Sequence, residues 1–445
     1  MILKRDLRKD AWTIIRAAIL GTDPEKLTNA ALSTGDSRFS VGGLDYDFAS
    51  FKNIYLIGTG KAAASMARGA ETALGERITE GIVSVKDGYG RDDLVKVEVL
   101  EAAHPVPDER GAAATRRLLE LAEKAGEDDL VIFLISGGGS ALMALPAGEL
   151  KLADLKALTE ALLKSGASIG EINAVRKHLF NGTGGGMVRA AWPARMLTLI
   201  ISDVIGDNLD VIASGPTVPD TSTYADAFDV LHKYGLEDSA APALLSHLRA
   251  GLMGEAAETP KPGDRIFERV NNVVLASNRT ALDAAAIAAG EIGYNVFSLT
   301  SMLEGEARDM AGLFSIIARD EEQHGRPLPV PACLLAGGET TVTVTGKGKG
   351  GRAQEFTLAA AARMQDLGRS LIFAVGTDGT DGPTEAAGAL ALADTVSRAM
   401  SLGIDVRRSL DNNDSNSFFR ALGDLIVTGP TLTNVNDIYG VLVTE

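Results

Sequence analysis

Three apolar runs, each ended by a loop of Gly, Ser and Asp, constrain the fold of this chain most. Residues 130–135, LVIFLI, lead into SGGGS, and later runs lead into ISDVIGD and GTDGTDGP. Continuous apolar runs with β-branched residues predict strands that are buried on both faces, as in parallel sheets. Because the carboxyl ends of parallel strands share one sheet edge, we interpret the three loops as parts of one site.

Predicted strands and amphipathic helices alternate along the chain. A helix at 5–21 precedes a strand at 53–58, an alanine-rich helix follows, and a helix at 108–125 leads into the strand at 130–135. This order predicts an α/β fold with mostly parallel sheets and a Rossmann-like N-terminal domain.

A break in the pattern suggests how the chain divides into domains. Residues 250–265 combine Pro, Gly and charge without periodicity, so we place a domain boundary there. We therefore predict one α/β domain over 1–250 and a second over 265–445. Apolar and polar residues alternate at 337–344, which favours an antiparallel strand in the second domain.

Charge and composition exclude several classes of function. The 445 residues carry 43 basic and 59 acidic side chains, and a net charge of −16 argues against nucleic acid and anionic membranes as partners. The single cysteine, Cys333, excludes a disulfide framework and a cysteine-based zinc site. With no apolar signal region and no run of membrane-spanning length, we expect a cytoplasmic protein that binds small molecules.

The stretch GTGKAA at residues 58–63 fits the G-x-G-x-x-A pattern between a strand and a helix. That context is typical of dinucleotide binding, and Asp87 lies where a ribose partner could follow. Lys61 sits inside the turn, where a cation suits a transferring phosphoryl group or a substrate carboxylate. The alternative is a surface lysine above a tight turn.

Pairs of aspartates mark two of the loops. Asp203 and Asp207 follow one strand, and Asp378 and Asp381 follow another. Mg²⁺ prefers one or two carboxylates with phosphate oxygens and water, and a carboxylate can also serve as a general base. The alternative is that these aspartates form turns or cap helices.

Basic residues gather in two further places. Lys347, Lys349 and Arg352 lie among glycines, which suits a clamp for phosphates, although a solvated hairpin turn is the alternative. Arg176 and its neighbours Lys177 and His178 lie at the end of a predicted helix, where they would offset the charge of its carboxyl end.

Several long motifs carry a family resemblance: LISGGGSALMALP, ISDVIGDNLDVIASGPTVPD, GGRAQE and GTDGTDGPTEAAGA. Over residues 10–445 the chain resembles the glycerate 2-kinase family, also called the MOFRL family, many of whose members are labelled hydroxypyruvate reductase. The resemblance implies two α/β domains with the active site in the cleft between them, and a MOFRL region at about 330–440. It also implies transfer of the ATP γ-phosphoryl group to the 2-hydroxyl of D-glycerate with Mg²⁺, giving 2-phosphoglycerate.

The chain departs from the family pattern at three positions. Ala353 replaces the usual Asn, Phe180 replaces Ser, and Thr183 replaces Lys. A missing amide and a missing cation in a cleft that handles phosphate could change the substrate or weaken the activity.

We therefore predict an Mg-ATP-dependent kinase, with ATP as substrate and Mg²⁺ as cofactor. An NAD(P)H-dependent hydroxypyruvate reductase and a non-catalytic sugar-acid or nucleotide sensor are the alternatives. The sequence leaves the oligomeric state open, a homo-oligomer included. The expected site residues share a place in these loops: catalytic Lys61, Arg352 and Asp203; binding Gly58, Gly60, Ser136, Gly137, Gly138, Gly139, Ser140, Lys347, Lys349 and Asp378; metal-binding Asp207 and Asp381.

Overall fold

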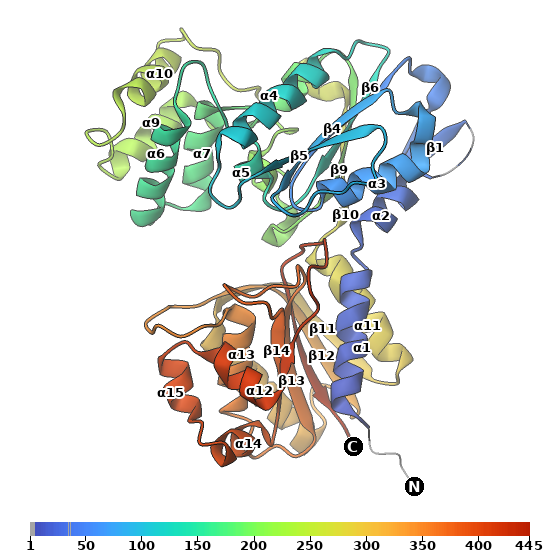
Figure 1. Ribbon diagram of the computed structural model, residues 1–445, viewed down its shortest axis with the longest axis vertical. Helices are drawn as coiled ribbons and strands as arrows, with labels where there is room; N and C mark the ends of the chain where they lie inside the picture. The colour runs from blue at the N-terminus through green and yellow to red at the C-terminus, as the bar shows by residue number, and fades with distance from the viewer. Residues whose placement is uncertain (1–4, 34, 36) are drawn as a thin grey trace. The chain divides into compact units, whose positions relative to one another are not determined.

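The structure, a computed structural model, describes residues 5–33, 35 and 37–445 (Figure 1). The chain forms two compact units. Unit 1 contains the described residues up to Asp23 together with Ala276–Glu445, and unit 2 contains Pro24–Leu275. The expected boundary at 250–265 therefore differs from the observed division, and the first helix belongs with the C-terminal part. None of the helices in the described residues has the length and apolar character needed to cross a membrane.

Unit 2 is built on a six-stranded sheet whose strand order is β10-β9-β6-β3-β4-β5. Every pairing from β9 through β5 is parallel, as expected from the sequence. All six side chains of the run that opened the sequence are buried, because helices cover both faces. The strands are β3 (Ile54–Thr59), β4 (Glu80–Lys86), β5 (Val97–Ala102), β6 (Leu130–Ile135), β9 (Arg195–Ile201) and β10 (Val270–Ala276).

Nine α-helices accompany this sheet in the described part of unit 2: α2 (Pro24–Leu32), α3 (Ala63–Leu74), α4 (Glu109–Glu123), α5 (Gly139–Leu142), α6 (Leu152–Lys164), α7 (Ile169–Leu179), α8 (Gly186–Ala191), α9 (Tyr224–Lys233) and α10 (Pro242–Leu252). Among these, α6, α7, α9 and α10 pack on one another around an apolar core of their own (Figure 1). A capping box between Ser168 and Glu171 fixes the start of α7. The capping box therefore sets the first turn of α7, which packs mainly on α9.

Unit 1 contains a second six-stranded sheet, with the order β11-β12-β16-β13-β14-β15. Only β11 and β12 pair in parallel, and the other pairings are antiparallel. The expected α/β class is confirmed, with a parallel sheet in unit 2 and a mixed sheet in unit 1. The strands are β11 (Asn295–Glu306), β12 (Ala332–Thr341), β13 (Ser370–Gly376), β14 (Gly388–Leu392), β15 (Leu425–Ile426) and β16 (Asp437–Val443).

Helices cover both faces of this mixed sheet. On one face lie α1 (Leu7–Leu20) and α11 (Asn278–Glu291), and on the other lie α12 (Ala307–His324) and α13 (Arg352–Ala361) (Figure 1). Helix α1 joins unit 1 because Ile14 and Ile15 are fully buried, and Tyr294 donates a hydrogen bond of 2.8 Å to Asp10. Three short helices complete the unit: α14 (Thr395–Ser401), α15 (Val406–Asp411) and α16 (Ser415–Leu422).

Candidate active site

In unit 2, the loop after β3 and the loop after β6 are locked together. Gly60 has a φ of +121°, and a Cβ atom there would lie 2.3 Å from Ser136 Oγ. The Lys61 N–H donates to Gly137 O at 2.8 Å, and the Ala62 N–H donates to Ser136 Oγ at 2.9 Å. Gly58, Gly60 and Ser136 through Ser140 therefore meet at the carboxyl edge of the sheet. Of the three loops expected to share one sheet edge, those after β6 and β9 lie on this sheet, but the one after β13 lies on the separate sheet of unit 1.

The same contacts weaken the dinucleotide interpretation of this turn. A dinucleotide-binding turn offers its N–H groups to pyrophosphate, and here the N–H groups of Lys61 and Ala62 are used by the neighbouring loop. Asp87, the expected ribose partner, makes a two-pronged ion pair with Arg110 at 2.7 Å for each contact. The N–H groups of this turn hold the two loops together and are not offered to a ligand.

His104, which sequence reasoning missed, lies beside Lys61. Gly138 has a φ of +86°, and a Cβ there would lie 2.9 Å from the His104 ring and 3.6 Å from Lys61 Cγ. Burial, with Lys61 and Lys86 nearby, lowers the pKa of His104 to about 4, so its imidazole is neutral at pH 7. The signal was available, since His104 follows β5 at the same sheet edge as the glycine loops.

Ser140 reaches a second group of polar residues on the far side of the glycine turn. Its Oγ lies 3.0 Å from Ser214 Oγ, and its carbonyl oxygen accepts a hydrogen bond of 2.7 Å from Arg176 Nη2. Arg176 lies on α7, and sequence reasoning assigned it to the helix end alone. The arrangement joins Arg176 to the predicted glycine loop.

Asp203 and Asp207 follow β9, the strand next to β6 in the sheet. Both side chains are partly exposed, and Asp207 has a φ of +54°, which L-residues rarely adopt. Farther along, Asp210 and Asp220 pair with the buried Lys177. Asp203 and Asp207 are therefore two partly exposed carboxylates at this sheet edge, and Asp210, which is also partly exposed, differs from them in its ion pair with Lys177.

In unit 1, Arg352 is the first residue of α13 and contacts two carboxylates. Its Nε and Nη2 donate to the two oxygens of Asp437 at 2.5 and 3.1 Å, and Nη1 donates to Glu339. Although burial opposes it, the carboxylate of Asp437 raises the pKa of Arg352. Three of the five guanidinium N–H groups are used, and two remain for a phosphate.

Asp381, an expected metal ligand, holds the start of the same helix. Its Oδ1 accepts from the Ala353 N–H at 3.1 Å, and its Oδ2 accepts from the Gln354 N–H at 2.8 Å and from Gln354 Nε2 at 2.9 Å. Burial raises the pKa of Asp381 to about 6, with a further contribution from nearby Asp437. Because N–H donors occupy both of its oxygens, the structure uses Asp381 as a helix cap.

Lys347 and Lys349 belong to the glycine-rich loop that the sequence interpretation treated as a clamp for phosphates. Their side chains are exposed, but their N–H groups donate to Asn412 Oδ1 and Asp414 Oδ1 at 3.1 Å each. The loop is therefore anchored along its backbone, and Arg352 lies outside it on α13. The expected clamp of three cations consists of two exposed lysines and one carboxylate-bound arginine.

Asp378 lies in the loop after β13 and forms a local turn. Its Oδ1 accepts from both the N–H and the hydroxyl of Thr380 at 2.9 Å. Thr377, just before it, donates its N–H to Asn436 O at 3.0 Å, next to Asp437. Asp378 and Arg352 therefore belong to one end of the unit 1 sheet.

Among the described residues, no group of three or more His, Cys, Asp or Glu side chains forms a preassembled metal site. Mg²⁺ is commonly held by nucleotide phosphates with only one or two carboxylates. Asp203, Asp207 and Asp378 fit that limited role because each side chain is partly exposed. Asp381 does not fit this role, because its two oxygens accept hydrogen bonds from the start of α13.

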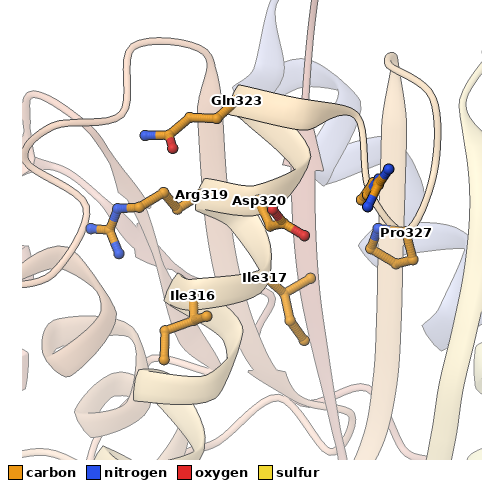
Figure 2. A pocket seen from close by; sticks show the side chains of 7 residues that line it. Ile316, Ile317, Arg319, Asp320, Gln323 and Pro327 are labelled. Atoms are coloured by element: carbon orange, nitrogen blue, oxygen red, sulfur yellow. The ribbon is translucent and has the colours of Figure 1, made fainter.

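One surface pocket lies away from both sheet edges, on the carboxyl half of α12 and the turn that follows (Figure 2). Arg319 makes a two-pronged pair with Asp366 at 2.9 and 3.0 Å, and Asp320 accepts from His324 at 2.9 Å. Arg319 and Asp320 thus already have partners, and the pocket contains none of the predicted site residues, so it is not part of the candidate site.

Two family models match the chain. The model described as "Domain of unknown function (DUF4147)" matches residues 10–249, and the "MOFRL family" model matches residues 332–437. A protein of Pyrococcus horikoshii named "Glycerate 2-kinase" is 41% identical over 100% of this chain and 99% of its own. A protein of Agrobacterium vitis named "Putative hydroxypyruvate reductase" is 44% identical over 87% of this chain and 86% of its own.

Solved structures agree with these matches over nearly the whole chain. A crystal structure of a glycerate kinase from Thermotoga maritima has a TM-score of 0.88 at 39% identity, covering 98% of this chain and 99% of that one. A protein structure from P. horikoshii has a TM-score of 0.87 at 40% identity and covers both chains completely.

Proposed function

The chain belongs to the glycerate 2-kinase family, and from this premise we propose that it transfers the γ-phosphoryl group of ATP to the 2-hydroxyl of D-glycerate. The bond from the γ-phosphorus to the β–γ bridging oxygen breaks, a new bond forms to the substrate oxygen, and the hydroxyl proton leaves. The products are ADP and 2-phosphoglycerate. Small molecules are then its partners, and the cytoplasm is the expected compartment.

The observation that carries this proposal is the construction around Lys61. Backbone N–H groups of the Lys61 turn bind Gly137 O and Ser136 Oγ of the other loop, and Lys61 lies at the sheet edge beside a neutral His104. Phosphoryl transfer requires positioning and charge neutralisation more than covalent chemistry. We assign Lys61 to the transferring group and Asp203 to the proton of the acceptor hydroxyl.

The groups of unit 1 have proposed roles in holding nucleotide phosphates. Arg352 keeps two N–H donors beyond its carboxylate contacts, and Lys347 and Lys349 are exposed cations nearby in sequence. That these groups and Lys61 act on one substrate in a cleft between the units is part of the proposal, and it rests on the family resemblance.

Mg²⁺ is the proposed cofactor, carried mainly by the nucleotide. When bound, it would neutralise phosphate charge. Asp207 is the proposed carboxylate ligand in unit 2, and Asp378 is the proposed one in unit 1. We withdraw the metal role predicted for Asp381, since backbone and side-chain N–H groups occupy its oxygens.

One assay separates the proposal from its alternatives. Purified protein is mixed with D-glycerate and Mg-ATP, and separately with hydroxypyruvate and NADH or NADPH. ADP release with a 2-phosphate product, identified by ³¹P NMR, supports the kinase. Oxidation of NADH or NADPH without ADP release would support a reductase, the activity for which some relatives are named. If neither ADP release nor cofactor oxidation is detected, a non-catalytic sensor is favoured.

A further inference from the structure

Arg176 on α7 is a largely enclosed guanidinium that has no acidic partner among the described residues. Its Nη2 donates to Ser140 O at 2.7 Å, and its Nε is buried without any acceptor. The next residue, Lys177, provides a direct contrast. Lys177 is 4% exposed and is paired with both Asp210 and Asp220. Of these two adjacent cations on α7, Lys177 has carboxylate partners and Arg176 has none among the described residues.

An unpaired, enclosed cation is costly to keep. Burial of a charge without a partner opposes folding, and desolvation lowers the pKa of Arg176. Arginine nevertheless stays protonated at neutral pH. A glutamine or leucine at this position would avoid the cost, so the charge indicates that an anion from outside the chain binds here.

The neighbours of Arg176 form a set of polar groups without a carboxylate. Asn173, one turn earlier on α7, accepts from Ser214 Oγ at 3.3 Å, and Ser214 Oγ lies 3.0 Å from Ser140 Oγ. The Asn173 Nδ2 donors have no acceptor in the part of the chain that the structure describes. Hydroxyl, amide and guanidinium donors therefore gather around one place.

The backbone that supplies Ser214 is strained. Ala213 and Ser214 have φ values of +49° and +60°, which residues other than glycine rarely adopt. Such strain persists where the surrounding structure imposes it, and it is concentrated at functional sites. Here it places the Ser214 hydroxyl between Asn173 and Ser140.

The Phe180 ring helps to orient the guanidinium. The Arg176 Cζ lies 5.5 Å from the centroid of this ring, which is within cation–π range. The contact and the hydrogen bond to Ser140 O together restrict the arginine side chain. A preoriented planar fork matches a planar carboxylate through two parallel hydrogen bonds.

This cluster and Lys61 flank the same short turn. Lys61 Cγ lies 3.6 Å from the position of a Cβ on Gly138, and Arg176 contacts Ser140, two residues later. Two residues span at most about 7 Å of chain. A small acid held by Arg176 can therefore present a hydroxyl toward Lys61.

We propose that Arg176, together with Asn173, Ser140 and Ser214, binds the carboxylate of the substrate acid. The inference rests on the proposed function and deepens it, since it assigns the acid group of the substrate to one place and the phosphoryl group to another. Arg176 is a binding and positioning residue, while Lys61 faces the reacting atoms.

The test compares Arg176→Gln and Arg176→Lys with Arg116→Gln, an exposed arginine on α4 that undergoes the same loss of charge. Loss of a hydrogen-bonded charge contact should raise the KM for D-glycerate roughly 30-fold or more in Arg176→Gln. The KM for ATP should stay within about twofold, and Arg176→Lys should be intermediate. Arg116→Gln should match the wild type.

Two binding measurements accompany the kinetics. Calorimetry should show that the wild type binds D-glycerate and not glycerol, which lacks the carboxylate, and that Arg176→Gln binds D-glycerate roughly 30-fold more weakly or below detection. Without ligand, Arg176→Gln should melt at the wild-type temperature or above it, because an unpaired buried charge is removed. Added D-glycerate should raise the melting temperature of the wild type and leave that of Arg176→Gln unchanged.

The outcomes separate this inference from the proposed function. A wild-type KM for D-glycerate in Arg176→Gln, or an equal rise in the KM for ATP, would overturn the inference while the kinase assignment stands. If the wild type neither binds D-glycerate nor releases ADP, the proposed function fails. Other hydroxy acids are then tested for binding by the same calorimetry. An acid that binds the wild type but not Arg176→Gln supports the carboxylate site, and the inference is overturned if the wild type binds none of the acids.

Discussion

Arg352→Lys keeps the positive charge at the start of α13 but removes its planar fork. In the wild type, Nε and Nη2 hold both oxygens of Asp437, and Nη1 holds Glu339. A lysine ammonium reaches from a single point and cannot make the same parallel contacts. Asp437 is 2% exposed, so water cannot replace the lost donor.

The contacts set the size of the effect. Lysine can keep at most one of the two contacts to Asp437, and a hydrogen bond to a charged group contributes about 1.5–3 kcal/mol. We therefore expect the free energy of unfolding to fall by about 2 kcal/mol. Turnover should fall by about 10² or more, because the two remaining N–H donors that would hold a phosphate also lose their geometry.

Both quantities should be measured on one preparation, with unfolding followed by denaturant titration and turnover by ADP release. Arg319→Lys is the matched control, because Arg319 makes the same two-pronged contact with Asp366, but in a pair whose side chains are 34% and 58% exposed. It should lose far less stability and no turnover. Wild-type turnover in Arg352→Lys would refute the assignment of Arg352 to the site, and wild-type stability would refute the structural argument.

Four other outcomes are expected. Lys61→Ala should lower turnover about 10²–10³-fold without changing the melting temperature, since the turn is held through its backbone; unchanged turnover would remove Lys61 from the mechanism. Excess EDTA should abolish ADP release and Mg²⁺ should restore it, so full activity in EDTA would contradict the metal proposal. Ala353→Asn should lower the free energy of unfolding by about 2 kcal/mol in a denaturant titration, because the Ala353 side chain is fully enclosed in the apolar core. Ala353→Ser is the smaller polar control. Higher glycerate turnover with unchanged stability in Ala353→Asn would contradict this prediction. For Asp381, the pKa of about 6 in the folded protein lies above the ordinary value of 3.8, so its contribution to stability is present below pH 4 and lost as pH rises through 6. Between pH 4 and pH 6 the free energy of unfolding of the wild type should therefore fall by about 3 kcal/mol relative to that of Asp381→Asn. If the free energies of unfolding of the two proteins change with pH in parallel, Asp381 does not titrate in that range.

The sequence was most informative where local chemistry decides structure. The apolar run of β6 and the glycines after it predicted a buried strand, a tight turn and a place at the sheet edge, and the structure contains all three. Lys61 was identified for a similar reason, because the G-x-G-x-x-A pattern marks the strand–turn–helix unit that contains it, although the loop after β6 also holds this turn. Both features depend on residues that are close together in the chain.

The features that sequence reasoning missed depend on distant residues. Asp381 lies 28 residues from the helix start that it caps, and Arg352 lies 85 residues from Asp437, so no local pattern distinguishes a cap from a ligand or a paired arginine from an open one. The same holds for α1, which belongs to unit 1 through contacts such as the one between Asp10 and Tyr294. Tertiary pairing, and not propensity, decides these cases.

The three departures from the family pattern now differ in what they can affect. Ala353 points into the core, and Thr183 is 3% exposed and donates its hydroxyl to Phe180 O at 3.0 Å, so neither presents a group to a ligand. Phe180 alone reaches the candidate site, through its contact with Arg176. A serine there would remove the ring that orients the guanidinium. Any change in acceptor preference that these departures cause should therefore act through Phe180 and appear in the KM for the acid, because the groups around Lys61 are untouched.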